Sequence, residues 1–417
     1  MDDFTNDFTR EEIEALEKEV ERNPDDAVAW ADLGFCYGNL GDHQQASTAL
    51  QKAVELDPSL ASVWANLGGS YASLGNFQKA TDALHKAVEL DPSLVLAWAN
   101  LGRAYGELGD YQQAVEASQK AVELEPGLAP EWANLGGFYT LLANFQQATD
   151  ALRKAVELDP SLVLAWANLG KAYGELGDYQ QAVEASEKAI ELEPGLAPEW
   201  ANLGGFYTSL ANFQQAVKAY RKAIELDPSL VLAWANLGRA CAELGDYQQA
   251  IEASQKTVEL EPDLALAWAN LGWSYTSLDN FQQAAAALQK AVELEPGLTP
   301  AWANLGGSYA LLGNFQQAVE AYQKAVELEP GLTPAWANLG RACAELGNFQ
   351  QAVEAYRKAV ELEPGLTPAW ANLGRAYGEL GNHERAIEIY RKVLSITDDP
   401  DLTRLAQDGL KSLQAGV

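Results

Sequence analysis

Most of the chain repeats one stretch of sequence, Val95-Leu-Ala-Trp-Ala-Asn-Leu-Gly-Arg-Ala-Tyr-Gly-Glu-Leu-Gly-Asp-Tyr-Gln-Gln-Ala-Val-Glu-Ala-Ser-Gln-Lys-Ala-Val-Glu-Leu-Glu-Pro-Gly-Leu128. This unit is 34 residues long, and its tryptophan and proline return at that spacing along the chain. The periodic tryptophans are Trp30, Trp64, Trp98, Trp132, Trp166, Trp200, Trp234, Trp268, Trp302, Trp336 and Trp370. Eleven copies fit between Ala27 and Pro400, which predicts an array of units that each contact their neighbours.

Seven residues of the unit stand at the spacings of a known repeat pattern. They are Trp98, Leu101, Gly102, Tyr105, Ala114, Ala121 and Pro126. The chain therefore resembles a tetratricopeptide repeat protein over about nine-tenths of its length. The resemblance implies a pair of helices in each unit, and we predict an all-α fold, a right-handed α-solenoid superhelix.

Turn residues predict where the two helices of each unit begin and end. In the quoted unit the first helix should end at Leu108, with Gly109 and Asp110 forming the turn. The second helix should run from about Tyr111 to Glu123, because proline at Pro126 cannot continue a helix. Five units also carry a proline in the first turn of the next helix, where a missing N–H does little harm. These are Pro130, Pro198, Pro300, Pro334 and Pro368.

Both ends of the array carry segments that fit a capping role, because repeat arrays need a polar face at each end. Residues 1–26 should hold a disordered start followed by a helical half repeat, residues 27–400 the eleven repeats, and residues 401–417 a capping helix. In the half repeat, Leu16 falls at the place of Leu50 and Val20 at that of Val54. In the final helix, Leu402, Leu405, Leu410 and Leu413 are expected to cover the last exposed face.

The charge of the chain argues against two classes of partner. There are 28 Lys and Arg residues against 59 Asp and Glu, a formal net charge of −31. No basic stripe offers the positive surface that a nucleic-acid backbone requires. No apolar run approaches the roughly 18 residues that suggest a membrane span. We therefore expect neither nucleic acid nor membrane as a partner.

The cysteines and the N-terminus indicate a cytoplasmic protein. Cys36, Cys241 and Cys343 are odd in number and far apart, which disfavours a disulfide framework and fits a reducing compartment. The first ten residues are acidic and lack the basic and apolar regions of a secretory signal.

We interpret the small and aromatic residues of the unit first as packing residues. Glycine at the place of Gly102 recurs in all eleven units, although glycine inside a helix costs roughly 0.5–1 kcal/mol relative to alanine. A close approach of the paired helices should offset that cost. The tryptophans are expected to pack between units rather than to form a ligand cage.

No catalytic or metal-binding set is apparent. The histidines His43, His85 and His383 are too scattered for the close spacing of a metal site. The motifs of phosphate-binding loops, serine hydrolases and zinc proteases are absent from the sequence. We expect a protein that is not an enzyme and needs no cofactor.

One asparagine per unit, two residues after the tryptophan, is the strongest candidate for binding. The row consists of Asn66, Asn100, Asn134, Asn168, Asn202, Asn236, Asn270, Asn304, Asn338 and Asn372, with Asp32 in the first unit. The family resemblance implies that these first helices line the inner face of the superhelix. The row also resembles the asparagine ladder in the repeats of O-linked N-acetylglucosamine transferases, which implies contact with a peptide backbone. The alternative is that each asparagine bonds a neighbouring helix, and the sequence leaves both open.

Three residues after the asparagine, the unit varies between basic residues and glycine. The basic residues are Arg103, Lys171, Arg239, Arg341 and Arg375. Each precedes an acid by four residues, as Arg103 precedes Glu107. Two interpretations are therefore open: these residues form surface ion pairs, or they select the ligand. Trp273 takes this place in the eighth unit, either as an anchor for a partner or packed against a neighbouring unit. Phe138 and Phe206 are expected to pack and to line the same face.

We therefore predict a scaffold that binds an extended peptide segment of a partner protein in its groove. Family members that bind chaperones hold a terminal carboxylate with a lysine directly after the tryptophan. Here that residue is always alanine, as in Ala99, so such a partner is unsupported. The rival functions are a self-assembling structural protein and a regulatory subunit of an enzyme complex.

Overall fold

The computed structural model describes residues 10–415, which form 24 helices and no strand. The chain divides into two compact units, which follow one another in sequence at Ala211 and Asn212. The helices of the first unit are α1 (Arg10–Arg22), α2 (Ala27–Asn39), α3 (His43–Leu56), α4 (Ala61–Ser73), α5 (Phe77–Leu90), α6 (Val95–Leu108), α7 (Tyr111–Leu124), α8 (Ala129–Leu141), α9 (Phe145–Leu158), α10 (Val163–Leu176), α11 (Tyr179–Leu192) and α12 (Ala197–Ser209). Within residues 10–415, no helix is both long enough and apolar enough to cross a membrane.

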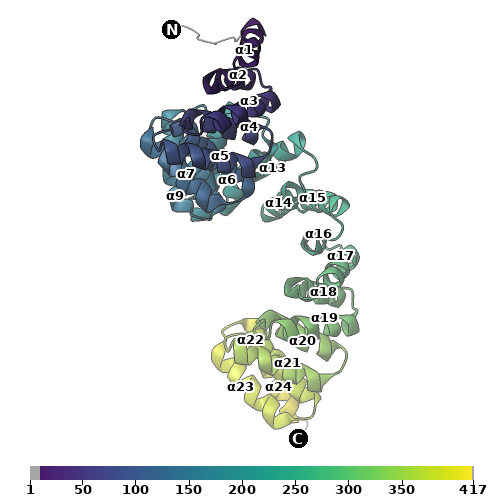
Figure 1. Ribbon diagram of the computed structural model, residues 1–417. Helices are drawn as coiled ribbons and strands as arrows, with labels where there is room; N and C mark the ends of the chain where they lie inside the picture. The colour runs from purple at the N-terminus through teal and green to yellow at the C-terminus, as the bar shows by residue number, and fades with distance from the viewer. Residues whose placement is uncertain (1–9, 416–417) are drawn as a thin grey trace. The chain divides into compact units, whose positions relative to one another are not determined.

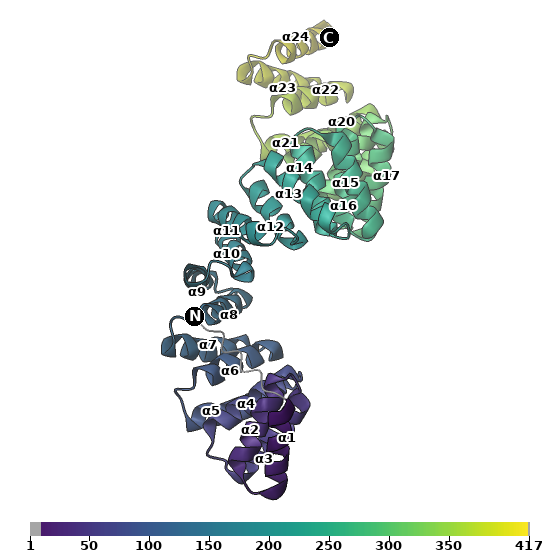
Figure 2. The same cartoon turned by 90° about the horizontal axis from the view of Figure 1, so that it is seen from above.

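The second unit continues the same alternation of helices. Its helices are α13 (Phe213–Leu226), α14 (Val231–Glu243), α15 (Tyr247–Leu260), α16 (Ala265–Ser277), α17 (Phe281–Leu294), α18 (Thr299–Leu311), α19 (Phe315–Leu328), α20 (Thr333–Glu345), α21 (Phe349–Leu362), α22 (Thr367–Glu379), α23 (His383–Ile396) and α24 (Pro400–Ala415). Within each unit, successive helices pack side by side, as α14 and α15 do in Figures 1 and 2. The even-numbered helices from α2 to α22 are called the first helices below, and the odd-numbered ones from α3 to α23 the second helices.

The helix boundaries agree with the predicted turns. α6 ends at Leu108, and Gly109 follows it with a φ of 79°, in the left-handed region that favours glycine. The Asp110 side chain then accepts a hydrogen bond from the Gln113 N–H and caps α7. α7 ends at Leu124, two residues before Pro126. Proline occupies the first turn of α8, α12, α18, α20 and α22, as expected.

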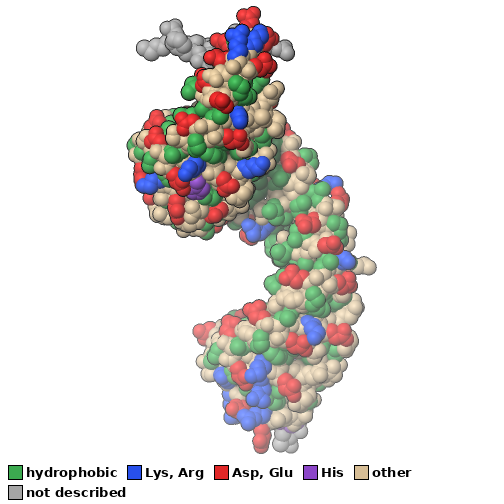
Figure 3. All heavy atoms as spheres, in the orientation of Figure 1, with side chains coloured by type: hydrophobic (Ala, Val, Ile, Leu, Met, Phe, Trp, Pro, Cys, Tyr) green, Lys and Arg blue, Asp and Glu red, His purple; other side chains and the backbone are tan. Residues whose placement is uncertain are grey.

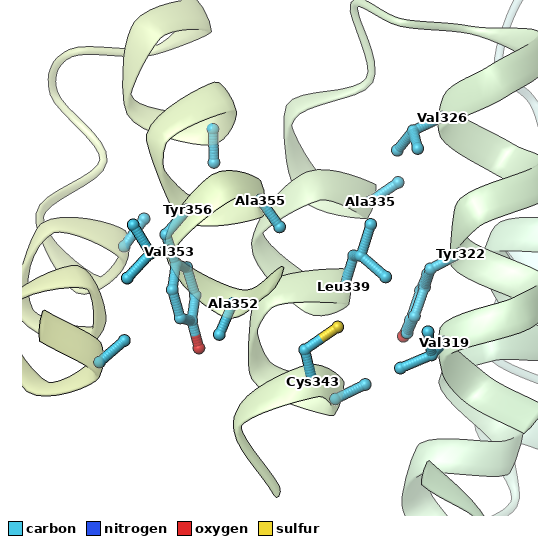
Figure 4. Close-up of a cluster of buried hydrophobic side chains, with 14 of the residues drawn as sticks. Val319, Tyr322, Val326, Ala335, Leu339, Cys343, Ala352, Val353, Ala355 and Tyr356 are labelled. Carbon is cyan, nitrogen blue, oxygen red and sulfur yellow. The ribbon is translucent and has the colours of Figure 1, made fainter. Parts of the chain in front are cut away.

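Small residues allow the two helices of a repeat to approach closely. A Cβ atom at Gly102 would lie 2.5 Å from Ser118 Oγ and 3.2 Å from the Ala114 carbonyl oxygen. Ala114 and Ala121 are completely buried. In the second unit, Leu339 and Cys343 of α20 lie between Tyr322 of α19 and Tyr356 of α21 (Figure 4). Gly102 thus leaves space for the second helix of its repeat. The resulting close packing offsets the free-energy cost of a glycine inside a helix.

The periodic tryptophans join consecutive repeats. In every repeat the indole Nε1 donates a hydrogen bond to the carbonyl oxygen of the proline six residues earlier, as Trp98 does to Pro92 at 2.9 Å. Trp98 also packs against a buried cluster drawn from two repeats, which includes Leu84 of α5 and Leu101 of α6. Each tryptophan thus fastens the start of a first helix to the end of the preceding second helix, and its role is structural.

The helix before the first repeat packs in the manner of a second helix. Ile13 and Val20 of α1 are buried against α2, with Leu16 beside them. The Tyr37 hydroxyl donates a hydrogen bond to Glu17 at 2.5 Å, and one repeat later the Tyr71 hydroxyl donates to Gln51 at 2.6 Å. Because the two bonds are equivalent and one repeat apart, α1 has the contacts of a half repeat. The predicted disorder of Met1 to Thr9 lies outside the described residues.

The final helix, α24, packs against the last repeat largely as expected. It differs from the expected packing at one residue, Leu405. Leu402, Leu410 and Leu413 pack against the last repeat, and Ala406 is completely buried. Leu405 is 37% exposed, so the expectation that it covers the last face is wrong. Leu402, Ala406 and Leu410 follow one another at intervals of four residues on one helix face. Leu405 precedes Ala406 by one residue, which turns it away by about 100°.

Candidate functional site

The asparagine row stands at the same position of each first helix from α4 to α22. Asn66 and Asn202 are exposed, and the other eight side chains are half-buried. Each amide therefore reaches solvent from a helix whose opposite face is fixed by core packing. Asn100 on α6 also comes close to α4, because a Cβ atom at Gly69 would lie 3.7 Å from its Nδ2. A ligand lying across successive first helices would meet these amides in order.

Few of these amides have a partner within the protein. Among residues 10–415, seven of the ten side chains make no hydrogen bond, and none bonds a neighbouring helix. The seven are Asn66, Asn168, Asn236, Asn270, Asn304, Asn338 and Asn372. The alternative interpretation of the row, in which each amide bonds an adjacent helix, is therefore not what the structure contains.

The three bonded amides are oriented by partners on their own helices. Asn134 and Asn202 donate from Nδ2 to the carboxylates of Glu131 and Glu199, at 3.3 and 3.2 Å. Asn100 instead accepts a hydrogen bond at Oδ1 from the Arg103 guanidinium. A carboxylate only accepts and a guanidinium only donates, so the partner dictates which end of the amide faces it. Asn134 and Asn202 thus keep Oδ1 available, whereas Asn100 keeps Nδ2 available.

Two of these partners are carboxyl groups that sequence reasoning missed. Glu131 and Glu199 are 9% and 5% exposed, and the Ser186 hydroxyl donates to Glu199 at 2.5 Å. Burial raises the pKa of Glu199 above its ordinary value, and the hydrogen bonds from Ser186 and Asn202 oppose that rise. The equivalent hydroxyl one repeat pair earlier, Ser118 Oγ, is buried without a partner. The signal in the sequence was an acid replacing alanine one residue before the tryptophan.

The basic residues of the first helices are all exposed: Arg103, Lys171, Arg239, Arg341 and Arg375. In the described part of the chain none forms an ion pair within 4.0 Å, so the expected pairs with the acid four residues later do not form. Arg103 bonds Asn100 instead. Arg341 lies beside the buried Tyr322 hydroxyl and opposes the rise that burial causes in the pKa of this tyrosine. The ion pairs lie mostly on second helices, as between Lys120 and Glu123 at 2.6 Å.

The first helices carry little of the negative charge of the protein. Together α2 to α22 hold five basic and eight acidic residues, a net charge of −3, against −31 for the whole chain. Two of the eight acids are the buried Glu131 and Glu199. Figure 3 shows acidic and basic side chains intermixed on the face it displays. The long-range field of the protein is therefore acidic, while the surface that carries the amides is nearly neutral.

Two hollows in the first unit bring predicted site residues together. One, of about 440 Å³, spans α2, α4 and α6 and is lined by Phe35, Asn66, Asn100 and Arg103. The other, of about 560 Å³, lies between α8 and α10. Asn134, Asn168 and Lys171 line it. Both volumes fall in the range of about 300–1,000 Å³ that ligand pockets span.

The aromatic candidates pack against neighbouring repeats and also remain accessible. Phe138 on α8 lies over Gly106 on α6 and lines the hollow between α8 and α10. Phe206 on α12 lies over Gly174 on α10 in the same way. Trp273 is 40% exposed, and its ring meets Tyr247 of the preceding repeat edge-on at 5.8 Å. Packing against a neighbouring unit is thus part of the role of Trp273.

Three exposed apolar residues near the row were not singled out from the sequence. Leu141 and Leu164 line the hollow between α8 and α10 and are 56% and 73% exposed, and Phe35 of the other hollow is 45% exposed. For Leu141 the available signal was a leucine where most other repeats carry glutamate or serine, as at Glu107 and Ser73.

Metal ligands and free thiols are further candidates for a functional site among the described residues. Among residues 10–415, no three His, Cys, Asp or Glu side chains are grouped so that they could hold a metal ion. Cys36, Cys241 and Cys343 are buried and free. Burial raises the pKa of all three thiols, which keeps them protonated and unreactive.

Family models described as tetratricopeptide repeat match most of the chain. The matched residues are 27–60, 59–124, 132–162, 163–196, 209–265, 265–298, 299–332, 333–366 and 367–400. A search of curated proteins returned no match.

One solved structure supports the fold, and two others align with shorter parts of the chain. The C-terminal part of a repeat-containing protein from Cytophaga hutchinsonii aligns with a TM-score of 0.50 at 17% identity, covering 58% of this chain and 99% of that one. MamA aligns at 32% identity with a TM-score of 0.38, covering 39% of this chain and 95% of its own. YrrB, whose structure is described as having an unusual peptide-binding site, aligns at 26% identity with a TM-score of 0.42, covering 45% of this chain and 97% of its own.

Proposed function

Because the chain belongs to the tetratricopeptide repeat family, we propose that it is a non-catalytic scaffold that binds an extended segment of a partner protein along its first helices. The repeats themselves support a role in protein interaction. The three free, buried cysteines support a reducing compartment, and we propose the cytoplasm.

One observation carries this proposal: the row of side-chain amides, most of which make no hydrogen bond within residues 10–415. An amide offers two donors and an acceptor, and an extended peptide presents one N–H and one C=O per residue. Each bond formed would contribute about 0.5–1.5 kcal/mol, so affinity would build from several repeats and not from one. Such hydrogen bonds contact the backbone of the ligand and not its side chains, so the row is suitable for segments of varied sequence.

The side chains between the amides would supply selectivity. Where Asn100 is paired with Arg103, the surface offers a donor and a cation, whereas Asn134 offers an acceptor beside the small Gly137. Bulky ligand side chains would fit beside the glycines, and acidic ones beside Arg103, Lys171, Arg239, Arg341 and Arg375. Trp273 would add an aromatic contact in the eighth repeat.

The test is selection from a library of random 12-residue segments inserted in a surface loop of a carrier protein. Wild-type chain is compared with a variant in which Asn134, Asn168, Asn202 and Asn236 are all alanine. We expect the wild type to enrich binders that the variant fails to retain. A matched control replaces four exposed amides of second helices, Gln112, Gln146, Gln180 and Gln214, and should retain them.

Two of those asparagines bond buried carboxylates, so a second variant guards against a loss of folding. It replaces Asn168, Asn236, Asn270 and Asn304, whose amides leave no partner unpaired. Far-ultraviolet circular dichroism of each variant should match the wild type. Equal retention of the binders by wild type and both asparagine variants would contradict the proposal.

A further inference from the structure

The hollow between α8 and α10 differs from the rest of the first-helix surface in its apolar lining. Pro130, Phe138, Leu141 and Leu164 contribute side chains to it, and Gly137 keeps it open. Leu141 is the last residue of α8 and Leu164 lies in the first turn of α10, and both line the hollow. Their exposed fractions, 56% and 73%, leave most of this apolar surface in contact with water. Covering it with a ligand side chain would be favourable.

A single charge borders this hollow. Among the described residues that line it, only Lys171 is charged. Lys171 is exposed and makes neither an ion pair nor a side-chain hydrogen bond within the described chain. Lys171 is therefore available to pair with an acidic group of a ligand, although the whole protein carries a net charge of −31. A ligand that complements Lys171 and the apolar hollow carries an anionic group next to an apolar group.

We propose that this hollow is a subsite for an internal peptide segment in which a bulky apolar side chain stands beside an aspartate or glutamate. The proposal rests on the function proposed above and specifies the ligand of that surface. The apolar side chain enters the hollow that Phe138, Leu141 and Leu164 line. The carboxylate pairs with Lys171, while the amides of Asn134 and Asn168 hold the backbone.

The surroundings favour an internal segment over a chain end. The amide row continues on both sides of the hollow in the same unit, with Asn100 on α6 and Asn202 on α12. A ligand backbone held at Asn134 and Asn168 can therefore extend in both directions along the same row. The carboxylate that meets Lys171 is accordingly a side chain and not a terminus.

The experiment selects binders from the same random segments on immobilised wild-type chain and then synthesises one of them. The peptide carries an acetylated N-terminus, an amidated C-terminus and a fluorescent label, and its dissociation constant is measured by anisotropy. The variants are Lys171→Gln and the double change Leu141→Ser with Leu164→Ser. The matched controls are Leu96→Ser, which stands two repeats before Leu164 and is 74% exposed, and Lys154→Gln on the second helix α9.

We expect the selected segments to share an apolar residue beside an acid. Each site variant should weaken binding by about tenfold, and the controls by less than about twofold. Changing the acid of the peptide to its amide should weaken binding to wild type by about tenfold, and should add little further loss in Lys171→Gln.

Three results would overturn the subsite. One is a set of selected segments that lacks the pair, and another is unchanged affinity in both site variants. A third is binding that requires a free C-terminal carboxylate. If the binders still depend on the asparagine row, the proposed function stands and only the subsite fails. If wild type enriches no segment, both fail together.

Discussion

The ring of Phe138 on α8 occupies the space that a side chain at Gly106 on α6 would need. A Cβ atom at Gly106 would lie 2.5 Å from Phe138 Cε1, well inside van der Waals contact. Gly174 and Phe206 show the same relationship two repeats later. The glycine of one repeat and the phenylalanine of the next therefore form a matched pair, which occurs twice in the first unit and joins neighbouring first helices.

This pair predicts that Gly106→Ala destabilises the chain despite the better helix propensity of alanine. Overpacking of this kind costs about 1–3 kcal/mol, which exceeds the gain of roughly 0.5–1 kcal/mol expected from removing a helical glycine. The midpoint of urea unfolding should fall. In a Phe138→Ala background the same glycine change should be neutral or stabilising, because the ring is gone. Gly127→Ala, where a Cβ would meet nothing within 4 Å, serves as the control.

The turn between the two helices of a repeat predicts a stabilising substitution. Eight of the eleven turns place a glycine at positive φ, but Ala143, Ala211 and Asp279 adopt φ values of 58°, 55° and 59° in the same place. The left-handed region costs a residue with a Cβ about 1–2 kcal/mol, whereas glycine adopts it freely.

Ala143→Gly should therefore raise the free energy of unfolding by about 0.5–1 kcal/mol, after the greater unfolded-state entropy of glycine is subtracted. Thermal unfolding followed by circular dichroism measures it. Ala133→Gly, in the interior of α8, should lower stability instead. A loss of stability in both variants would contradict the strain at Ala143.

Repetition explains why so much of the fold was predictable from sequence. Eleven copies of the same proline and eight copies of the same turn glycine fixed the helix boundaries, so that α6 and α7 end within one residue of the expected positions. The final helix occurs once, and its register had to be inferred from four leucines alone. The buried Ala406 carries no hydrophobic signal strong enough to distinguish it from Leu405.

The candidate site was less predictable, because its details depend on contacts between repeats. The position of the asparagine row followed from the period, but the partners of Asn134 and Asn202 lie one turn earlier and are buried. The ion pair of Arg103 with Glu107, one of the two interpretations that the sequence left open, does not form, since the guanidinium bonds Asn100. The hollow between α8 and α10 exists because the first helices of two consecutive repeats present Leu141 and Leu164 to the same space. The sequence pattern of one helix does not show which residues of the next repeat lie beside it.

The buried carboxyl of Glu199 predicts a pH dependence of stability. Its pKa in the folded state is raised above the ordinary value of 4.5, mainly by burial. Between the unfolded and folded pKa values the folded state therefore binds more protons, and the free energy of unfolding contributed by this group falls as pH rises through that window. Below the window the contribution is fully present.

Glu199→Gln should remove this dependence, because the amide is uncharged and can still donate to Ser186 and accept from Asn202. The stability of the variant relative to wild type should accordingly increase as the pH rises above 4.5, the ordinary pKa of the carboxyl group. Urea unfolding at a series of pH values measures the difference. Glu191→Gln on the exposed face of α11 is the control and should show no comparable trend. If the stability of the variant relative to wild type instead falls as the pH rises, the ionised carboxylate of Glu199 stabilises the folded state, and the prediction is wrong.

The register of α24 predicts unequal effects of two of its leucines. Leu410 packs with Ala406 against Tyr390, whereas Leu405 is exposed. Leu410→Ser should lower the free energy of unfolding by about 1–2 kcal/mol, somewhat below the value for a fully buried leucine, because Leu410 is half-buried. Leu405→Ser should change it by less than about 0.5 kcal/mol. Hydrogen exchange of amides in α23 and α24 would locate the loss, since an array opens from its ends. Equal losses in the two variants would show that Leu405 also covers the last repeat.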